Sequence, residues 1–397
     1  MMTAAEKLLS EAPAQRVLLC EARSCGDELV KILYGHASAV LFTGRRSAER
    51  CGAYAAVVGA AERASCRLAR FNAIEPEPGM ETVLAMRDFI AAEKPEVVVA
   101  AGGGSILDAA KAAYLMLQSS WQLAEHFGVD KYSSAFPDAV LKRIVAIPTT
   151  SGTGSECTAY SNIVDREHAV KKLICERLTV PEVSLVCPEF ASSMPRGVTL
   201  ATGCDALAHL LEGFLNVRAD CNHPRANDWA LTGIRLIRDH LAAALEAPDD
   251  LAARRGMAVA ASLGGMVIRY KSTGLPHLCS FSWFGRIEHG IAAILLLPAA
   301  WRYYLEEPSV AERTMLLRDI FGGDTPAGVV AGFREFLTSL GVPKSLAAYP
   351  DITPELLEKT AASGRENAMK LELAPRRVPL ERSREILAAI LDEARRG

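Results

Sequence analysis

From the N-terminus to about residue 185, short runs of β-branched residues alternate with longer alanine-rich segments, and this alternation constrains the fold most strongly. The short runs are apolar and bounded by turn residues, as in buried strands, whereas the longer segments have the composition and spacing of helices. Strands that alternate with helices predict a doubly wound, mostly parallel sheet. The predicted strands are residues 17–20, 39–43, 97–100 and 143–147, and the predicted helices are residues 48–59, 82–92 and 106–118.

The sequence changes character after Pro188. From Thr199 onward it is rich in Ala, Leu, Glu and Arg, and its apolar residues recur at helical spacing with few strand-like runs. We therefore expect a Rossmann-like α/β domain at residues 1–189, followed by an all-α domain at residues 190–397.

Composition and charge exclude several classes of function. The 397 residues are 50% hydrophobic and 23% charged, which is ordinary for a globular protein. A formal net charge of −3 provides no basic stripe for nucleic acid or for an anionic membrane. Glu6 and Glu11 stand where a signal peptide needs an apolar core, and the apolar residues 291–301 are too few to span a bilayer. The 10 cysteines are irregularly spaced, so we expect reduced thiols and a cytoplasmic location.

Three consecutive glycines, Gly102, Gly103 and Gly104, stand between a predicted strand and a predicted helix. Because glycine has no side chain, a diphosphate can approach the backbone there, and the N–H groups at the positive end of the helix attract it. A tight turn that binds nothing would need the same glycines. The triplet alone therefore leaves both interpretations open.

A second polar segment, residues 148–156, reads Pro-Thr-Thr-Ser-Gly-Thr-Gly-Ser-Glu and follows the predicted strand at residues 143–147. Hydroxyl groups beyond the carboxyl end of a strand suit the binding of sugar or phosphate oxygens. Similar clusters also form plain surface loops. Two such segments, each after a buried strand, favour a nucleotide site.

Four residues form a candidate metal site. Asp205 and His209 are four residues apart, which places both side chains on one face of a helix. His277 and His289 follow and bracket a short segment. One carboxylate and three imidazoles would suit Fe²⁺ or Zn²⁺, with a position left for a substrate oxygen. A single histidine is more often structural than ligating, so the spacing alone leaves the question open.

Four motifs occur along the chain in a fixed order. They are GGGSILDAAK at residues 102–111, residues 148–156 with Thr158, TGCDALAH at residues 202–209, and HGIA at residues 289–292 leading into LLLP at residues 295–298. In these motifs the sequence resembles the iron-containing (group III) alcohol dehydrogenase family, within the superfamily that includes dehydroquinate synthase and glycerol dehydrogenase. The last hundred or so residues match only in their helical character.

The resemblance implies a dehydroquinate synthase-like fold and an enzyme that interconverts a small alcohol and its aldehyde or ketone, using NAD(P)H and one divalent metal. The metal would act as a Lewis acid on the carbonyl oxygen while hydride arrives. The implied metal ligands are Asp205, His209, His277 and His289. The implied cofactor residues are Gly103, Gly104, Ser105 and Asp108 at the diphosphate, and Thr149, Thr150, Thr153 and Lys171 or Lys172 around the remainder.

The residues after the predicted strand at 39–43 differ from those of many NAD-using relatives, which place there an aspartate that would repel a 2′-phosphate. Here Gly44 occupies that place, and Arg45, Arg46 and Ser47 follow. Loss of the carboxylate and gain of two cations favour NADP(H) over NAD(H), because guanidinium pairs well with phosphate. The alternative is two solvated arginines on a loop.

The segment between the last two implied ligands also departs from the family. Many relatives carry a further histidine four residues after the third ligand, and Phe281 stands there instead. We expect Phe281, Phe284 and Arg286 to shape the substrate pocket. Arg286 would then either pair with an anionic group of the substrate or be an exposed surface charge.

Two other enzyme types with this fold are the alternatives: a maleylacetate-reductase-like enzyme that needs no metal, and a dehydroquinate-synthase-like lyase. Retention of all four ligand positions favours the metal-dependent dehydrogenase, and the basic phosphate pocket of the lyase is not evident. The expected partner is a small alcohol or aldehyde, with neither nucleic acid nor membrane. The resemblance also implies a homodimer or larger homo-oligomer.

Overall fold

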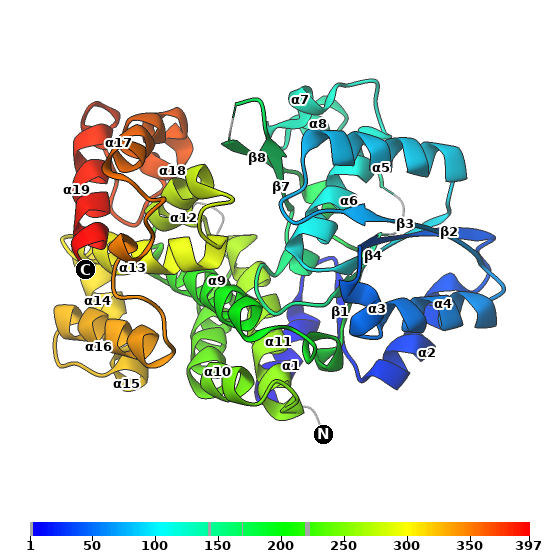
Figure 1. Ribbon diagram of the computed structural model, residues 1–397, viewed down its shortest axis with the longest axis horizontal. Helices are drawn as coiled ribbons and strands as arrows, with labels where there is room; N and C mark the ends of the chain where they lie inside the picture. Colours follow the sequence, from blue (N-terminus) through cyan, green and yellow to red (C-terminus); the bar gives the residue numbers. More distant parts are fainter. Residues whose placement is uncertain (1–2, 142–143, 169, 219–222) are drawn as a thin grey trace. The chain divides into compact units, whose positions relative to one another are not determined.

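The computed structural model describes residues 3–141, 144–168, 170–218 and 223–397 (Figure 1). Its chain divides into two compact units. The first comprises Met1–Thr199 with Ala243–Met266, and the second comprises Leu200–Ala242 with Val267–Gly397. The domain division expected from the sequence places residues 190–397 together, whereas the helical residues 243–266 belong to the first unit.

The main sheet of the first unit contains six of the described strands, all parallel, in the order β1-β9-β6-β4-β2-β3. These strands are β1 (Arg16–Leu19), β2 (Ser38–Gly44), β3 (Arg67–Ile74), β4 (Val97–Gly102), β6 (Ile144–Pro148) and β9 (Val183–Val186). The chain runs from β2 to the edge strand β3, returns to β4 on the other side of β2, and continues to β6. Doubly wound sheets bind ligands at the carboxyl ends of strands around such a reversal.

The predicted parallel α/β fold is confirmed, and all four predicted strands are present within one or two residues. Arg143, the first residue of the last predicted strand, lies outside the described residues. Two strands of the main sheet were missed: β3, in which Arg67 and Arg70 interrupt the apolar pattern, and the short β9. The helix predicted at residues 48–59 is divided by Gly52, which has φ +85°, into α3 (Ser47–Arg50) and α4 (Ala53–Arg63).

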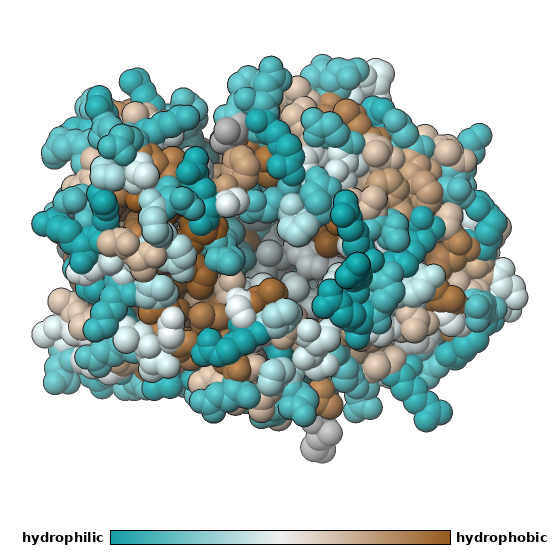
Figure 2. Space-filling model, viewed as in Figure 1, coloured by the Kyte–Doolittle hydropathy of each residue, from teal (hydrophilic) through white to brown (hydrophobic). Residues whose placement is uncertain are grey.

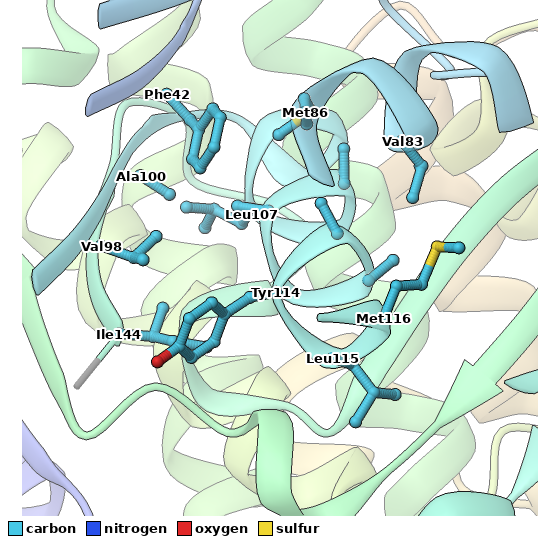
Figure 3. Packing of buried hydrophobic residues seen from close by; sticks show 14 of the residues in the cluster. Phe42, Val83, Met86, Val98, Ala100, Leu107, Tyr114, Leu115, Met116 and Ile144 are labelled. Atoms are coloured by element: carbon cyan, nitrogen blue, oxygen red, sulfur yellow. The ribbon is translucent and has the colours of Figure 1, made fainter. Parts of the chain in front are cut away.

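Helices pack on both faces of this sheet, and each face has its own apolar core. On one face, α2 (Ala22–Leu33) packs against α4. On the other, α5 (Met80–Glu93) and α6 (Gly104–Met116) pack against each other, and Figure 3 shows Leu107 and Tyr114 of α6 among side chains of β2, β4 and β6. Nearly every residue of α6 is buried. This packing fixes the helix whose N-terminus follows the glycine triplet.

A small second sheet, which the sequence did not predict, has the order β5-β8-β7 among the described strands. Its strands are β5 (Gly128–Val129), β7 (Tyr160–Asp165) and β8 (Val170–Cys175), and β7 and β8 are antiparallel. Besides α3, the short α-helices described in this unit are α1 (Ala4–Lys7), α7 (Leu123–His126) and α8 (Lys131–Ala135).

From residue 196 onward the described elements are helical, as predicted. They are α9 (Arg196–Leu215), α10 (Ala226–Glu246), α11 (Leu251–Ile268), α12 (Leu275–Ser280), α13 (His289–Tyr304), α14 (Pro308–Met315), α15 (Arg318–Phe321), α16 (Pro326–Ser339), α17 (Pro354–Ser363), α18 (Ala368–Glu372) and α19 (Ser383–Arg396). In the second unit the indole of Trp301 on α13 is fully buried and donates a hydrogen bond of 2.8 Å to Thr314 Oγ1 on α14.

Helix α11 is the one described helix long and apolar enough to cross a membrane by length and composition. However, 83% of this stretch is buried, as in a core helix of a globular protein. On the face shown in Figure 2, apolar side chains of the described residues are interspersed with hydrophilic ones.

Candidate functional site

The glycine triplet and the Thr/Ser segment meet at the carboxyl edge of the main sheet. The end of β4 pairs with the end of β6, with Gly102 beside Pro148, and the Thr149 N–H donates to the Gly102 carbonyl at 3.0 Å. Gly103 caps α6 without a side-chain hydrogen bond. A Cβ on Gly104 would lie 2.5 Å from Thr153 Cγ2, so only glycine allows this approach. The predicted diphosphate loop and the predicted threonines therefore form one surface.

Helix α11 supports the threonine segment from behind. A Cβ on Gly265 would lie 2.2 Å from the Gly154 carbonyl oxygen, so helix and loop are in backbone contact. Gly154 has φ +62°, a conformation that favours glycine. Ser262 of α11 donates a hydrogen bond of 2.7 Å to Glu156 Oε1, and burial raises the pKa of this carboxyl above its usual value. The segment is thus held by the protein itself.

Asp108 and Lys111 of α6 form a buried network with the same segment. Lys111 Nζ donates to Ser155 Oγ at 2.8 Å and lies 3.4 Å from Asp108 Oδ1. Asp108 Oδ1 accepts from Ser155 Oγ at 2.5 Å, and its Oδ2 accepts from the Asn162 N–H at 2.9 Å. Both carboxylate oxygens are therefore engaged within the protein. On this geometry, Asp108 shapes the loop rather than offering a free carboxylate at the expected diphosphate position.

Ser105 and Lys171 are linked through a residue that the sequence did not single out. Ser105 Oγ accepts a hydrogen bond of 3.1 Å from the Glu77 N–H, and Lys171 Nζ is 2.7 Å from Glu77 Oε1. Glu77 adopts φ +52°, which is uncommon for a residue with a side chain. Lys172, the other candidate, pairs with Asp165 at 2.7 Å instead.

Gly44 is the buried last residue of β2, and β2 lies next to β4 in the sheet. Arg45 and Arg46 follow it and are both exposed. The two guanidinium groups are therefore available to solvent just beyond the strand end where the sequence predicts the 2′-phosphate.

The four predicted metal ligands converge in the second unit. Asp205 and His209 project from α9, His277 from α12, and His289 is the first residue of α13. The Nε2 atoms of His209, His277 and His289 lie 3.8, 3.6 and 3.8 Å from the same atom, Asp205 Oδ1. Ligand atoms of Asp205, His209 and His277 lie within 4.8 Å of one another.

This cluster fits a cation. Asp205 Oδ1 and His277 Nε2 are buried and form no hydrogen bond with any described residue. The distance between Asp205 Oδ1 and His277 Nε2 is too long for a hydrogen bond. It is close to the roughly 3.4 Å expected between ligand atoms that are each about 2.1 Å from one tetrahedral metal ion. Buried polar atoms without partners are costly, and a shared cation would satisfy them.

Glu212 fixes the orientation of His277. Glu212 Oε1 lies 2.5 Å from His277 Nδ1, and Oε2 accepts from the Gly274 N–H at 2.6 Å. If His277 Nδ1 carries the proton donated to Glu212, its Nε2 lone pair points towards Asp205. A carboxylate behind a ligating histidine is a recurrent feature of metal sites.

The electrostatics of the cluster are those of a cation site. Burial opposes ionisation of Asp205, but the surrounding imidazoles hold its pKa well below the usual range. Burial lowers the pKa of His209 to about 4, so this imidazole is neutral at pH 7. Burial also disfavours the charged form of His277, yet Glu212 and Asp205 raise its pKa to about 9. A cation that enters the cluster would take the place of the His277 proton.

Helices α9 and α13 touch at Gly290, the residue after His289. A Cβ on Gly290 would lie 2.1 Å from the Ala201 carbonyl oxygen and 2.7 Å from Asp205 Cβ. Only glycine therefore allows the start of α13 to come close enough for His289 to face Asp205. This contact explains the His-Gly pair in the sequence.

The predicted pocket residues occupy different environments. The Phe281 ring stacks on His289, with ring centroids 5.5 Å apart and an interplanar angle of 19°. Phe284 is half-buried. Arg286 is exposed, and its Nη1 lies 3.5 Å from the Asp351 carbonyl oxygen. Of the two interpretations of Arg286, this environment favours the exposed surface charge.

The sequence also matches models of a known family. The model of iron-containing alcohol dehydrogenase matches residues 20–188, and the model of the C-terminal part of the Fe-containing alcohol dehydrogenase family matches residues 199–391. The chain belongs to the iron-containing alcohol dehydrogenase family. It is therefore an oxidoreductase that interconverts alcohols and carbonyl compounds, as the motifs predicted.

Individual relatives agree with this assignment. The 1-propanol dehydrogenase PduQ of Salmonella typhimurium is 30% identical over 82% of this chain and 86% of its own. The NADPH-dependent butanol dehydrogenase of Clostridium saccharobutylicum is 32% identical over 68% of each chain. The crystal structure of an iron-containing alcohol dehydrogenase from Thermotoga maritima has a TM-score of 0.80 at 27% identity, covering 96% of this chain and 98% of that one.

Sequence reasoning missed Glu212, Glu77 and Lys111 as parts of the two sites. For Glu212 a signal was present, because it lies three residues after His209 and seven after Asp205, on the same face of α9. For Glu77 there was none, because its contacts with Ser105 and Lys171 depend on the tertiary fold.

Proposed function

We propose that this enzyme reduces small aldehydes with NADPH at a divalent metal, Fe²⁺ or Zn²⁺, held by Asp205, His209, His277 and His289. The observation that carries the proposal is the convergence of three imidazole Nε2 atoms on one buried carboxylate oxygen. A bound divalent cation would supply a Lewis acid that polarises the substrate carbonyl.

The side chains around the ligands orient and shield the site. Glu212 holds the His277 ring through Nδ1, and Ser280 Oγ lies 3.3 Å from His289 Nδ1. Phe281 covers one face of His289 with an apolar ring and has no proton to exchange. Proton transfer to the product must therefore use a group other than this side chain.

We propose that the glycine loop and the threonine segment hold the cofactor diphosphate at the N-terminus of α6. Gly103, Gly104, Thr150 and Thr153 form the surface, and Asp108 and Lys111 keep its shape. We further propose that the enzyme acts in the cytoplasm as a homodimer or larger homo-oligomer.

The first experiment measures oxidation of NADPH with short aldehydes by protein stripped of metal and then reloaded with Fe²⁺ or Zn²⁺. We expect turnover to disappear on stripping and to return on reloading, because the metal would supply the Lewis acid that polarises the substrate carbonyl. Equal turnover by stripped protein would contradict the metal-dependent reaction and support the maleylacetate-reductase-like alternative.

The cofactor preference is tested with Arg45→Glu. We expect kcat/KM for NADPH to fall roughly 10- to 100-fold relative to that for NADH, because a carboxylate replaces a guanidinium beside the expected 2′-phosphate. The exposed Arg23→Glu in the same unit controls for the change in net charge. A preference unchanged by Arg45→Glu would place Arg45 away from the nucleotide.

A further inference from the structure

Tyr304, the last residue of α13, is a fully buried tyrosine that neither the motifs nor the proposed ligand set includes. Its hydroxyl oxygen accepts a hydrogen bond of 2.9 Å from the Leu275 N–H. Burial, and next the charge of Glu212, raise the pKa of this hydroxyl well above its usual value, so the group is neutral. Buried tyrosine hydroxyls usually have a hydrogen-bond partner, and here the partner is the backbone at the start of α12.

Helix α12 is short and begins without a capping side chain of its own. Gly274 precedes its first residue and has no side chain that could cap the helix, and Pro276 at the second position has no N–H. Leu275 is buried, so its N–H would be a costly unsatisfied donor if Tyr304 did not accept from it. A hydroxyl from another helix therefore supplies the cap of α12.

Two successive N–H groups at this point are held by two different helices. The Gly274 N–H donates to Glu212 Oε2 of α9 at 2.6 Å, and the next N–H, that of Leu275, donates to Tyr304 of α13. A Cβ on Gly274 would lie 2.6 Å from the Tyr304 oxygen and 3.5 Å from Glu212 Oε2. Glu212 Oε1 is also the partner of His277 Nδ1. The start of α12 is therefore fixed between α9 and α13, two residues before His277.

We propose that Tyr304 is a positioning residue of the metal site, and that its hydroxyl fixes the first turn of α12 so that His277 Nε2 faces Asp205 Oδ1. This inference rests on the proposed four-ligand metal site. Helix α13 would contribute to that site at both ends, because its first residue is the ligand His289 and its last residue holds the helix that carries His277. Glu212 orients the imidazole ring, whereas Tyr304 fixes the backbone from which that side chain projects.

The first test is Tyr304→Phe, which removes the hydroxyl and keeps the ring. We expect the affinity for Zn²⁺ to fall roughly 3- to 10-fold, less than in Glu212→Gln, because Tyr304 acts through the backbone and not on the imidazole itself. The visible absorption of Co²⁺ bound in place of Zn²⁺ depends on the geometry of the ligands, so this spectrum should change as well.

Tyr303→Phe is the matched control for this substitution. It removes a hydroxyl from the neighbouring residue, which donates to the Arg377 carbonyl oxygen at 3.1 Å, away from α12. Tyr303→Phe should leave the Zn²⁺ affinity and the Co²⁺ spectrum as in the wild type. If Tyr304→Phe were less stable to denaturant but had the affinity and the spectrum of Tyr303→Phe, its role would be structural only and the proposal would be overturned.

A second variant, Gly274→Ala, tests the contact itself. The new Cβ would clash with the Tyr304 oxygen, so α12 should shift and the affinity for Zn²⁺ should fall by roughly 10-fold or more. Tyr304→Phe removes that oxygen, and the next neighbours of the Cβ lie at 3.5 Å, an ordinary van der Waals distance. Gly274→Ala should therefore lower the affinity less in the Tyr304→Phe background than in the wild type. Equal losses in both backgrounds would contradict the proposal.

A measurement on metal-free protein separates this inference from the proposed function. The proton between His277 Nδ1 and Glu212 Oε1 should give a low-field NMR signal, assigned by its absence from His277→Asn. Tyr304→Phe should shift or broaden this signal, and Tyr303→Phe should not. A shifted signal in a protein that binds no metal would support the positioning role and count only against the proposed reaction. An unchanged signal, in a protein that binds Zn²⁺ and reduces aldehydes, would overturn the Tyr304 proposal alone.

Discussion

Replacing Gly290 with alanine is expected to destabilise the second unit and to disrupt the metal cluster. The added Cβ would lie 2.1 Å from the Ala201 carbonyl oxygen, so α13 must move away from α9 and take His289 with it. We expect a loss of about 2–3 kcal/mol in the free energy of unfolding of metal-free protein, typical of severe overpacking. Chemical denaturation measures the free energy of unfolding, and calorimetric titration of Zn²⁺ measures the metal affinity. Both should be lower in Gly290→Ala than in the wild type.

The matched control is Gly197→Ala, which lies near the start of α9, where an added Cβ meets no atom within 4 Å. This change should leave the stability equal or raise it by about 0.5–1 kcal/mol, because alanine has the better helix propensity. If Gly290→Ala behaved like Gly197→Ala in both measurements, α9 and α13 would not be in backbone contact at this point.

Replacing Asp205 with asparagine should have the largest effect on metal binding. All three imidazole Nε2 atoms face Asp205 Oδ1, and the substitution removes the charge while it preserves the size of the side chain. We expect the affinity for Zn²⁺ to fall by more than about 100-fold, with a matching loss of metal-dependent turnover. In Glu212→Gln the affinity for Zn²⁺ should fall less, by about 10- to 100-fold, as is typical when a residue that hydrogen bonds with a metal ligand is replaced.

The exposed Asp239→Asn, in the same unit, controls for the loss of one carboxylate. Metal content by elemental analysis and affinity by titration of stripped protein give two independent measurements of the series. An Asp205→Asn protein that binds Zn²⁺ as tightly as the Asp239→Asn protein would contradict the ligand assignment. A Glu212→Gln protein with the wild-type affinity would show that Glu212 does not orient His277.

The fold could be predicted where the pattern is local and regular. Buried parallel strands such as β4 are continuous apolar runs, and α6 follows one of them directly. Prediction failed where tertiary context decides. Strand β3 is an edge strand with an exposed Arg67 and a half-buried Arg70, and the pattern therefore looks polar.

The candidate site shows the same distinction between local and tertiary information. Asp205 and His209 could be paired from their spacing on one helix, whereas the sequence left His277 and His289 as open candidates whose role as ligands was implied by the family resemblance. The contact of Glu212 with His277 joins residues 65 positions apart, although the place of Glu212 on the same face of α9 as Asp205 and His209 was a local signal. Nothing local marks Glu77, whose contacts with Ser105 and Lys171 span 28 and 94 positions.

The proposed cofactor and the proposed metal ion would be bound by residues of different compact units of the chain. The residues proposed to hold the cofactor lie in Met1–Thr199, whereas the four proposed metal ligands lie in Leu200–Ala242 and Val267–Gly397. The cofactor and the metal ion would therefore each stabilise the folding of a different part of the polypeptide. In a cell, iron or zinc starvation would lower the folding stability of the helical unit, whereas depletion of the nucleotide pool would act on the sheet.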